Sequence, residues 1–164
     1  MVTDGGSSLP EVRRLLASLV AAKPTGAIAE IGTAFGDGTR AMADALGPTA
    51  TLVSVEPDRG RFDHAQQALA NARAELIHGR WEEVLPHRAP FDLIFFDGGL
   101  TEAGLDVAID LLAPGGILVK DDMTPGRATD GDPVRERLLR DHRVTGVEVL
   151  TTPRTAVIIA VRRA

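Results

Sequence analysis

The feature that most constrains the fold is an alternation of short apolar runs and amphipathic segments, which begins near residue 27. The apolar runs are five or six residues long and several carry β-branched residues, as strands buried on both faces of a sheet do. The segments between them have apolar residues at helical spacing. We expect strands at 27–31, 51–55, 74–78, 91–96 and 116–120, and helices near 39–46, 59–72, 81–85 and 102–112.

Strands that alternate with helices pair in parallel through right-handed crossovers. A helix over 8–22 precedes them, with Ser8 and Glu11 at the spacing of a capping box, while the small polar residues 1–7 are expected to be flexible.

The end of the chain has a different pattern. A charged helix is expected from Pro133 to Asp141, and the charge run over 135–143 is typical of a solvated helix face. Apolar runs at 144–150 and 155–161 are joined by a connection that allows only antiparallel pairing. The sequence therefore predicts one α/β domain over 1–164. Its fold is a Rossmann-like, doubly wound and mostly parallel sheet of seven strands, which closes with an antiparallel hairpin.

Composition excludes several classes of function. The formal net charge of -5 disfavours nucleic acid as a partner, because phosphate backbones are bound by basic faces. The absence of cysteine rules out disulfides, thiolate metal sites and a cysteine nucleophile. No apolar run approaches the roughly 20 residues that span a bilayer, and the first residues do not have the pattern of a secretory signal. We expect a cytoplasmic protein that does not associate with a membrane.

Ligands of open α/β sheets bind beyond the carboxyl ends of the strands, so the strand-to-helix junctions indicate the chemistry. The first junction has glycines at 32, 36 and 38, a spacing that differs from the G-x-G-x-x-G of dinucleotide sites and argues against an NAD-dependent dehydrogenase. Glu30 precedes these glycines, which disfavours a polyphosphate and suits a ligand with a cationic amine. A tight turn with a solvated acid is the alternative.

The next two junctions suit a nucleoside. Glu56 ends the second strand, where a carboxylate can accept hydrogen bonds from both ribose hydroxyls, although an acid there also stabilises a helix N-terminus. Trp81 follows the third strand and can pack against an adenine face, with Glu82 reading its amino group. Burial of Trp81 in the core is equally consistent with the sequence.

The last two junctions carry carboxylates. Asp97 follows the fourth strand, and Asp121 and Asp122 follow the fifth, its predicted neighbour at the centre of the sheet. Carboxylates that cluster without cysteine or histidine suit a hard cation such as Mg²⁺. Acids that only cap turns or hold loops are the alternative.

Six segments follow one another in a specific order: AIAEIGTAFGDGT, LVSVEPD, ELIHGRWEEVLP, FDLIFFDGG, LLAPGGILVKDD and VEVLTTPRTAVIIAVRR. In this order, from about residue 26 to 163, the chain resembles the class I S-adenosylmethionine-dependent methyltransferases. Within that class it is most similar to small-molecule O-methyltransferases of the catechol type. The resemblance implies methyl transfer to a hydroxyl of a small molecule, with S-adenosylmethionine as cofactor and Mg²⁺ as an assisting cation.

The resemblance also implies roles for individual residues. It places the methionine part of the cofactor against Gly32, Thr33 and Gly36, with Glu30 beside them. It places the ribose at Glu56 and Pro57 and the adenine at Arg80, Trp81 and Glu82. It places the metal at Asp97, Asp121 and Asp122, of which Asp97 also contacts the cofactor.

Two departures from the family pattern bear on catalysis. The lysine that commonly follows Asp97 by three residues as general base is Leu100 here, and the usual Asp-Asn pair is Asp121-Asp122. The catalytic candidates are Asp97, Asp121 and Lys120, the last as a replacement base if its side chain turns into the cleft. Two alternatives stay open: an N-methyltransferase, whose N/D-P-P-Y/F motif is missing, and a non-catalytic cofactor-binding or interaction domain. A small chain with an open cleft is also compatible with a homodimer, in which a partner's surface would complete the cleft.

Overall fold

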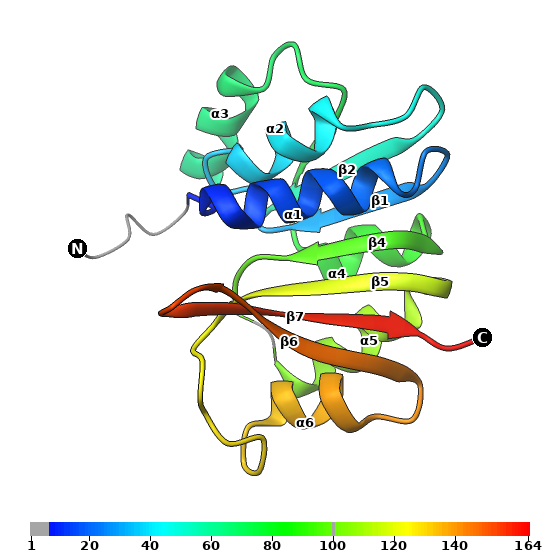
Figure 1. The fold of residues 1–164 in the computed structure, drawn as a ribbon. Coiled ribbons are helices and arrows are strands. Elements are labelled where there is room, and N and C mark those ends of the chain that lie inside the picture. Colours follow the sequence, from blue (N-terminus) through cyan, green and yellow to red (C-terminus); the bar gives the residue numbers. More distant parts are fainter. Residues whose placement is uncertain (1–6, 100) are drawn as a thin grey trace.

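The computed structural model describes residues 7–99 and 101–164. Within them, seven strands form one sheet in the order β3-β2-β1-β4-β5-β7-β6 (Figure 1). Strands β1 to β5 are parallel to one another and β6 and β7 form an antiparallel hairpin, as predicted. β7 is also antiparallel to β5. The strands are β1 Ala27–Ile31, β2 Thr51–Glu56, β3 Glu75–His78, β4 Phe91–Phe96, β5 Leu112–Met123, β6 Val144–Thr152 and β7 Thr155–Arg162.

Helices cover both faces of the sheet. The helices are α1 Pro10–Ala21, α2 Asp37–Asp44, α3 Arg59–Ala68, α4 Trp81–Val84, α5 Glu102–Asp110 and α6 Pro133–Arg140, with a short 3₁₀ turn at Leu85–His87. On one face, α1 and α2 bury Val12, Leu16 and Met42 against β1, β4 and β5. On the other face, α4, α5 and α6 pack on a second apolar cluster. No helix in the described part of the chain is long and apolar enough to cross a membrane.

The first helix begins later than the sequence predicts. Its N-cap is Leu9, whose side chain makes no capping hydrogen bond, so the expected capping box of Ser8 and Glu11 does not form. Ser8 is instead buried. Of the segment expected to be flexible, residues 1–6 lie outside the described residues, and the hydroxyl of Ser7 donates a hydrogen bond to Asp37.

Two boundaries in the middle of the chain also differ. α3 ends at Ala68 rather than near residue 72, and a turn that contains Asn71 follows, as that residue type favours. β5 begins at Leu112, because the backbone of 112–116 runs beside β4 with a register shift instead of forming a turn. A Cβ at Gly116 would lie 2.7 Å from the carbonyl oxygen of Phe91, so this close approach requires glycine.

α6 is not the solvated helix that its charges predict. Arg135 is only 1% exposed and lies between α6 and β6, whereas Arg140 on the same helix remains in solvent. The apolar stems of long side chains and their ion pairs allow such burial, which a charge pattern alone does not reveal.

The order of the strands reverses between β1 and β4. β1 pairs with β2 on one side and with β4 on the other, so the chain leaves this central pair in opposite directions. The carboxyl ends of β1 and β4 point to the left in Figure 1. Connections that diverge in this way leave a crevice at the carboxyl ends, where ligands bind in open α/β folds.

Candidate active site

A cavity of about 310 Å³ opens at the carboxyl ends of β1, β2 and β4. It lies at the reversal of strand order, where the junction residues were expected to gather. Seven of the ten predicted cofactor-binding residues line it: Gly32, Glu56, Pro57, Arg80, Trp81, Glu82 and Asp97. The sequence therefore identified most of the cavity wall.

The loop after β1 requires glycine at position 32. Gly32 has φ +94°, and a Cβ there would lie 2.0 Å from the carbonyl oxygen of Asp97, so no other residue fits without displacing the end of β4. The amide of Gly32 donates to the carbonyl of Val55 at 2.9 Å, and the amide of Asp97 donates to the carbonyl of Ile31 at the same distance. Three strand ends thus meet at this glycine.

Glu56 fixes the loop from the neighbouring strand. Its side chain is buried, and its two carboxylate oxygens accept hydrogen bonds at 2.9 Å from the amides of Ala34 and Asp58. Each carboxylate oxygen can accept a second hydrogen bond, so Glu56 keeps acceptor capacity on the side where it lines the cavity. This geometry suits a ligand with two adjacent hydroxyls.

Trp81 combines the two roles that the sequence left open. Its ring packs edge-on against Phe96, with ring centroids 5.5 Å apart, and it also lines the cavity. Arg80 and Glu82 flank it as an exposed ion pair at 3.4 Å. The half-buried indole therefore offers an apolar surface to a flat ligand while it anchors α4 to the sheet.

Three predicted residues do not line the cavity: Glu30, Thr33 and Gly36. The Glu30 carboxylate accepts hydrogen bonds from the hydroxyls of Thr39 and Ser54, and burial raises its pKa to about 8. Thr33 bonds the same Ser54 hydroxyl at 2.5 Å. Gly36, with φ +94°, is the N-cap of α2. The structure thus keeps Thr33 and Gly36 in the loop but away from the cavity wall, and it does not bring Glu30 to the cavity, where a cationic amine was expected to meet it.

The predicted carboxylates do come together. Asp97, Asp121 and Asp122 each offer one oxygen, and these oxygens all lie within 4.8 Å of one another. Burial raises the pKa of Asp97 to about 6, and the negative charges of Asp121 and Asp122 add to this effect. Burial likewise raises the pKa of Asp121. Three acids crowded in this way repel one another, so a bound cation would stabilise the cluster.

The donor set fits Mg²⁺. Octahedral Mg²⁺ holds oxygens at about 2.1 Å, so ligands on opposite sides are about 4.2 Å apart. The oxygens of Asp97, Asp121 and Asp122 lie within 4.8 Å of one another, so rotations of these side chains would bring all three to one ion, at which neighbouring ligands are about 3 Å apart. All three donors are hard oxygens, which this ion prefers.

The Lys120 ammonium lies against the backbone of Asp121 and not at the cavity. This ammonium is buried and donates to the backbone carbonyl of Asp121 at 2.6 Å, and it does not line the cavity. Burial lowers its pKa, which the charges of Asp122, Asp97 and Asp121 oppose. Leu100, at the position of the family lysine, lies outside the described residues.

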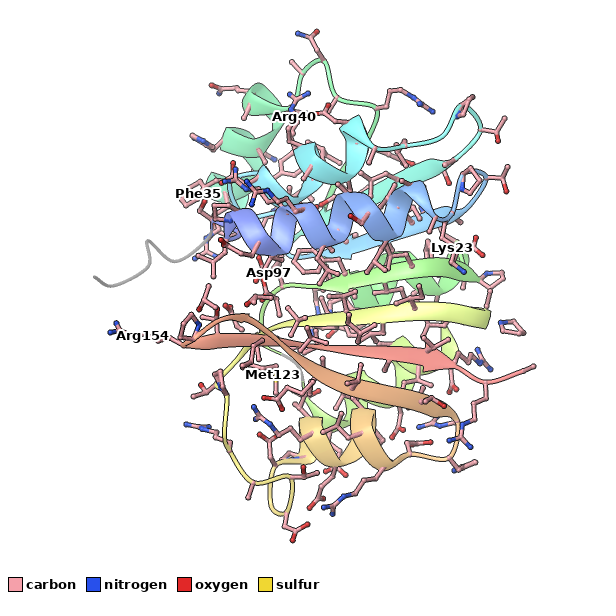
Figure 2. The ribbon with its side chains drawn as sticks, viewed as in Figure 1. Lys23, Phe35, Arg40, Asp97, Met123 and Arg154 are labelled. Carbon is pink, nitrogen blue, oxygen red and sulfur yellow. The ribbon has the colours of Figure 1, made fainter. Side chains whose placement is uncertain are left out.

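Further residues of the cavity wall escaped the sequence reasoning. They include Arg61, Phe96, Gly98 and Gly99. The two glycines directly follow Asp97 and were a usable signal, whereas Arg61 lies on α3 and no local pattern distinguishes it from the other arginines there. Figure 2 shows Phe35 and Arg154 at the same edge of the sheet as Asp97, on opposite sides of it.

Comparison with known proteins agrees with this geometry. A family model described as a methyltransferase domain matches residues 29–123, more than half of the chain. A protein of Mycobacterium ulcerans, whose name gives O-methyltransferase as a provisional assignment, is 30% identical over 151 residues. The match covers 87% of this chain and 65% of the relative, so the chain spans just under two thirds of that relative's length.

Solved structures share the whole fold. The O-methyltransferase TomG from Streptomyces achromogenes, in complex with S-adenosylmethionine, is 28% identical with a TM-score of 0.80, covering 99% of this chain and 83% of TomG. An O-methyltransferase from Bacillus cereus, in complex with S-adenosylhomocysteine, has the same fold with a TM-score of 0.78 at 24% identity, covering 96% of this chain and 83% of that one. With its sheet order, its glycine loop and the match over 29–123, the chain belongs to the class I S-adenosylmethionine-dependent methyltransferases.

Proposed function

We propose that this protein transfers the methyl group of S-adenosylmethionine to a hydroxyl group of a small molecule, with Mg²⁺ as an assisting cation. One observation carries the proposal: Asp97 belongs both to the nucleoside-sized cavity and to the cluster of three carboxylates. A cofactor seated in the cavity and an acceptor held at the carboxylates would therefore be neighbours. The Streptomyces relative of known structure is an O-methyltransferase in complex with S-adenosylmethionine, which supports the same reaction class.

The residues of the cavity would bind and orient the cofactor. S-adenosylmethionine supplies an electrophilic methyl group on its sulfonium. Glu56 has free acceptor positions for the ribose hydroxyls, and the Trp81 ring offers a flat apolar surface for the adenine. Gly32 lets the backbone approach the methionine part without a side chain in the way. Held by these residues, the cofactor would lie beside Asp97, which also lines the cavity.

The carboxylate cluster would bind and orient the acceptor. Asp97, Asp121 and Asp122 are the residues that would hold Mg²⁺, which as a Lewis acid lowers the pKa of a bound hydroxyl. Among the described residues, neither lysine nor histidine lines the cavity, and Asp97, the lining carboxylate that belongs to the cluster, would be engaged by the metal. The Lys120 ammonium, fixed on the Asp121 carbonyl, instead offsets part of the negative charge of the acids. This arrangement favours metal assistance over base catalysis.

The proposal is tested by methyl transfer from a labelled donor to a panel of catechols and phenols. Asp122→Ala is expected to reduce transfer at least 100-fold and to leave the affinity for S-adenosylhomocysteine within about twofold, because Asp122 does not line the cavity. Asp130→Ala is the matched control, since Asp130 is an exposed acid of the following loop that pairs with Arg140. Calorimetry measures the affinities.

Three results would contradict parts of the proposal. Undiminished turnover in EDTA would show that the reaction does not need a metal. Binding of S-adenosylhomocysteine without turnover on any acceptor favours the non-catalytic domain instead. Transfer to exocyclic amines in place of hydroxyls favours the N-methyltransferase. A homodimer, a cytoplasmic location and the exclusion of nucleic acid as a substrate stay predictions.

A further inference from the structure

The end of β5 is irregular at the point where it presents two of the three carboxylates. Lys120 pairs with Ile158 and Met123 pairs with Ala156, so β5 takes one residue more than β7 across this interval. This is a β-bulge, which bends a strand and redirects its side chains. Asp122 within the bulge has φ +60°, and its amide donates to a carboxylate oxygen of Asp121 at 2.8 Å.

A bulge with a left-handed aspartate is a strained element. A non-glycine residue at positive φ costs about 1 kcal/mol or more, although aspartate is among the side chains that tolerate it best. Such conformations persist where the surrounding structure fixes the backbone on both sides. The β-sheet pairing of Lys120 fixes one side. On the other side Met123, the last residue of β5, pairs with Ala156, and the chain then enters a loop, so an anchor just beyond Met123 would hold this last pair in place.

Arg135 supplies that anchor. Arg135 is 1% exposed, and its guanidinium donates to the backbone carbonyl of Thr124, two residues after Asp122, at 2.6 Å. The same guanidinium donates to Glu148 on β6 at 2.9 and 3.3 Å and to Asp132 at 2.6 Å. A buried arginine thus joins the bulged end of β5 to α6 and β6.

Only arginine can make this set of contacts. Its planar fork directs donors to three separate partners at once: Thr124, Asp132 and Glu148. A lysine ammonium presents its donors from one point and cannot span these partners. The arrangement therefore does more than neutralise the charge of Arg135, since one acidic partner would be enough for that.

We propose that Arg135 is a positioning residue for the Asp121-Asp122 pair: by holding the Thr124 carbonyl it fixes the bulge, and thereby the aim of both carboxylates toward Asp97. The part of this proposal that concerns the cation rests on the proposed function. The part that concerns the backbone does not, because the hydrogen bond from Arg135 to Thr124 acts on β5 with or without a ligand.

The test compares Arg135→Lys with Arg143→Lys. Arg143 is an equally well paired arginine, bound to Asp106, Asp110 and Asp141, but it makes no contact with the end of β5. Amide hydrogen exchange over residues 121–126 is expected to be at least tenfold faster in Arg135→Lys and within twofold of the unchanged protein in Arg143→Lys. The dissociation constant of Mn²⁺, used as the probe cation and measured by electron paramagnetic resonance, is expected to rise about tenfold in Arg135→Lys alone. The affinity for S-adenosylhomocysteine, bound on the other half of the sheet, should change less than twofold in both.

Each outcome decides one question. Unchanged exchange over 121–126 in Arg135→Lys overturns the proposal, and so does equal acceleration in both variants, which shows general loosening. If the unchanged protein binds no Mn²⁺, the metal part of the proposed function fails, while the exchange comparison still decides the role of Arg135. If Arg135→Lys does not fold, Glu148→Gln replaces it, because this change weakens the hold on Arg135; faster exchange at the same amides supports the proposal and unchanged exchange overturns it.

Discussion

Replacement of Glu30 by glutamine should change how stability depends on pH without impairing cofactor binding. Burial raises the pKa of Glu30 from 4.5 to about 8. Between these pH values the folded protein keeps a proton that the unfolded chain releases. The free energy of unfolding therefore falls by about 1.4 kcal/mol for each pH unit through this one group. Over the interval from 4.5 to 8 the loss amounts to about 5 kcal/mol.

Whether stability rises or falls with pH follows from the direction of the pKa change. A carboxyl whose folded pKa is raised contributes its full stability below the pKa of the unfolded chain, and this contribution is lost as pH rises through the folded value. Glutamine carries no titratable proton, and its carbonyl can still accept from the hydroxyls of Thr39 and Ser54. Glu30→Gln should therefore be relatively more stable than the unchanged protein as the pH approaches 8.

Urea unfolding from pH 5 to 8.5 measures the effect, with the fluorescence of Trp81, the sole tryptophan, and circular dichroism as probes. The difference in free energy of unfolding between the two proteins should change by several kcal/mol across this range. Glu75→Gln is the matched control, since Glu75 is an exposed acid of β3 that pairs with Arg88, and its pH profile should follow that of the unchanged protein.

Calorimetry with S-adenosylhomocysteine completes the test. Its affinity for Glu30→Gln should stay within about threefold, because Glu30 lies beneath the loop and not at the cavity. Parallel pH profiles for Glu30→Gln and the unchanged protein, together with a loss of affinity greater than tenfold, would refute the reasoning. That result would mean that the Glu30 carboxylate is ionised and faces the cationic amine of the ligand.

Two further predictions concern the cavity. Gly32→Ala should destabilise the fold by about 3 kcal/mol and weaken S-adenosylhomocysteine binding more than tenfold, because the new Cβ would lie 2.0 Å from the Asp97 carbonyl oxygen. Gly99→Ala, at a residue with nothing within 4 Å of its added Cβ, should have almost no effect on stability, and equal losses of stability in both variants would contradict the steric argument. Trp81→Ala should weaken the same ligand about tenfold through the lost stacking surface, and Trp81→Phe should restore most of the affinity. Wild-type affinity in Trp81→Ala would show that the indole serves only its packing on Phe96.

The sheet was predictable from the sequence because its central strands are buried on both faces. Runs such as 91–96 carry apolar residues without polar alternation, and the helices between them leave only parallel pairing. The carboxylate cluster was predictable for a related reason. Asp97 follows β4 and Asp121 lies near the end of the neighbouring parallel strand β5, and the carboxyl ends of such strands meet at one edge.

The surroundings of single polar side chains were not predictable in the same way. The partners of Glu30 come from α2 and β2, and only the folded pairing of β1 with β2 brings Ser54 beside it. Arg135 lies in a charged stretch that is typical of a solvated helix, and its partners Thr124 and Glu148 come from elements on either side of α6. Local pattern gives the face of an element, but the burial of one polar group depends on partners that are distant in the sequence.

The central place of β1 also matters while the chain is being synthesised. β1 can pair with β2 early, but its other edge stays open until β4 leaves the ribosome, since Ile28 is paired with Leu93. Nascent chains with open apolar edges are prone to associate with one another. A translational pause between His78 and Phe91 would prolong that state, and we expect slower synthesis through this stretch to lower the share of chains that reach the native form.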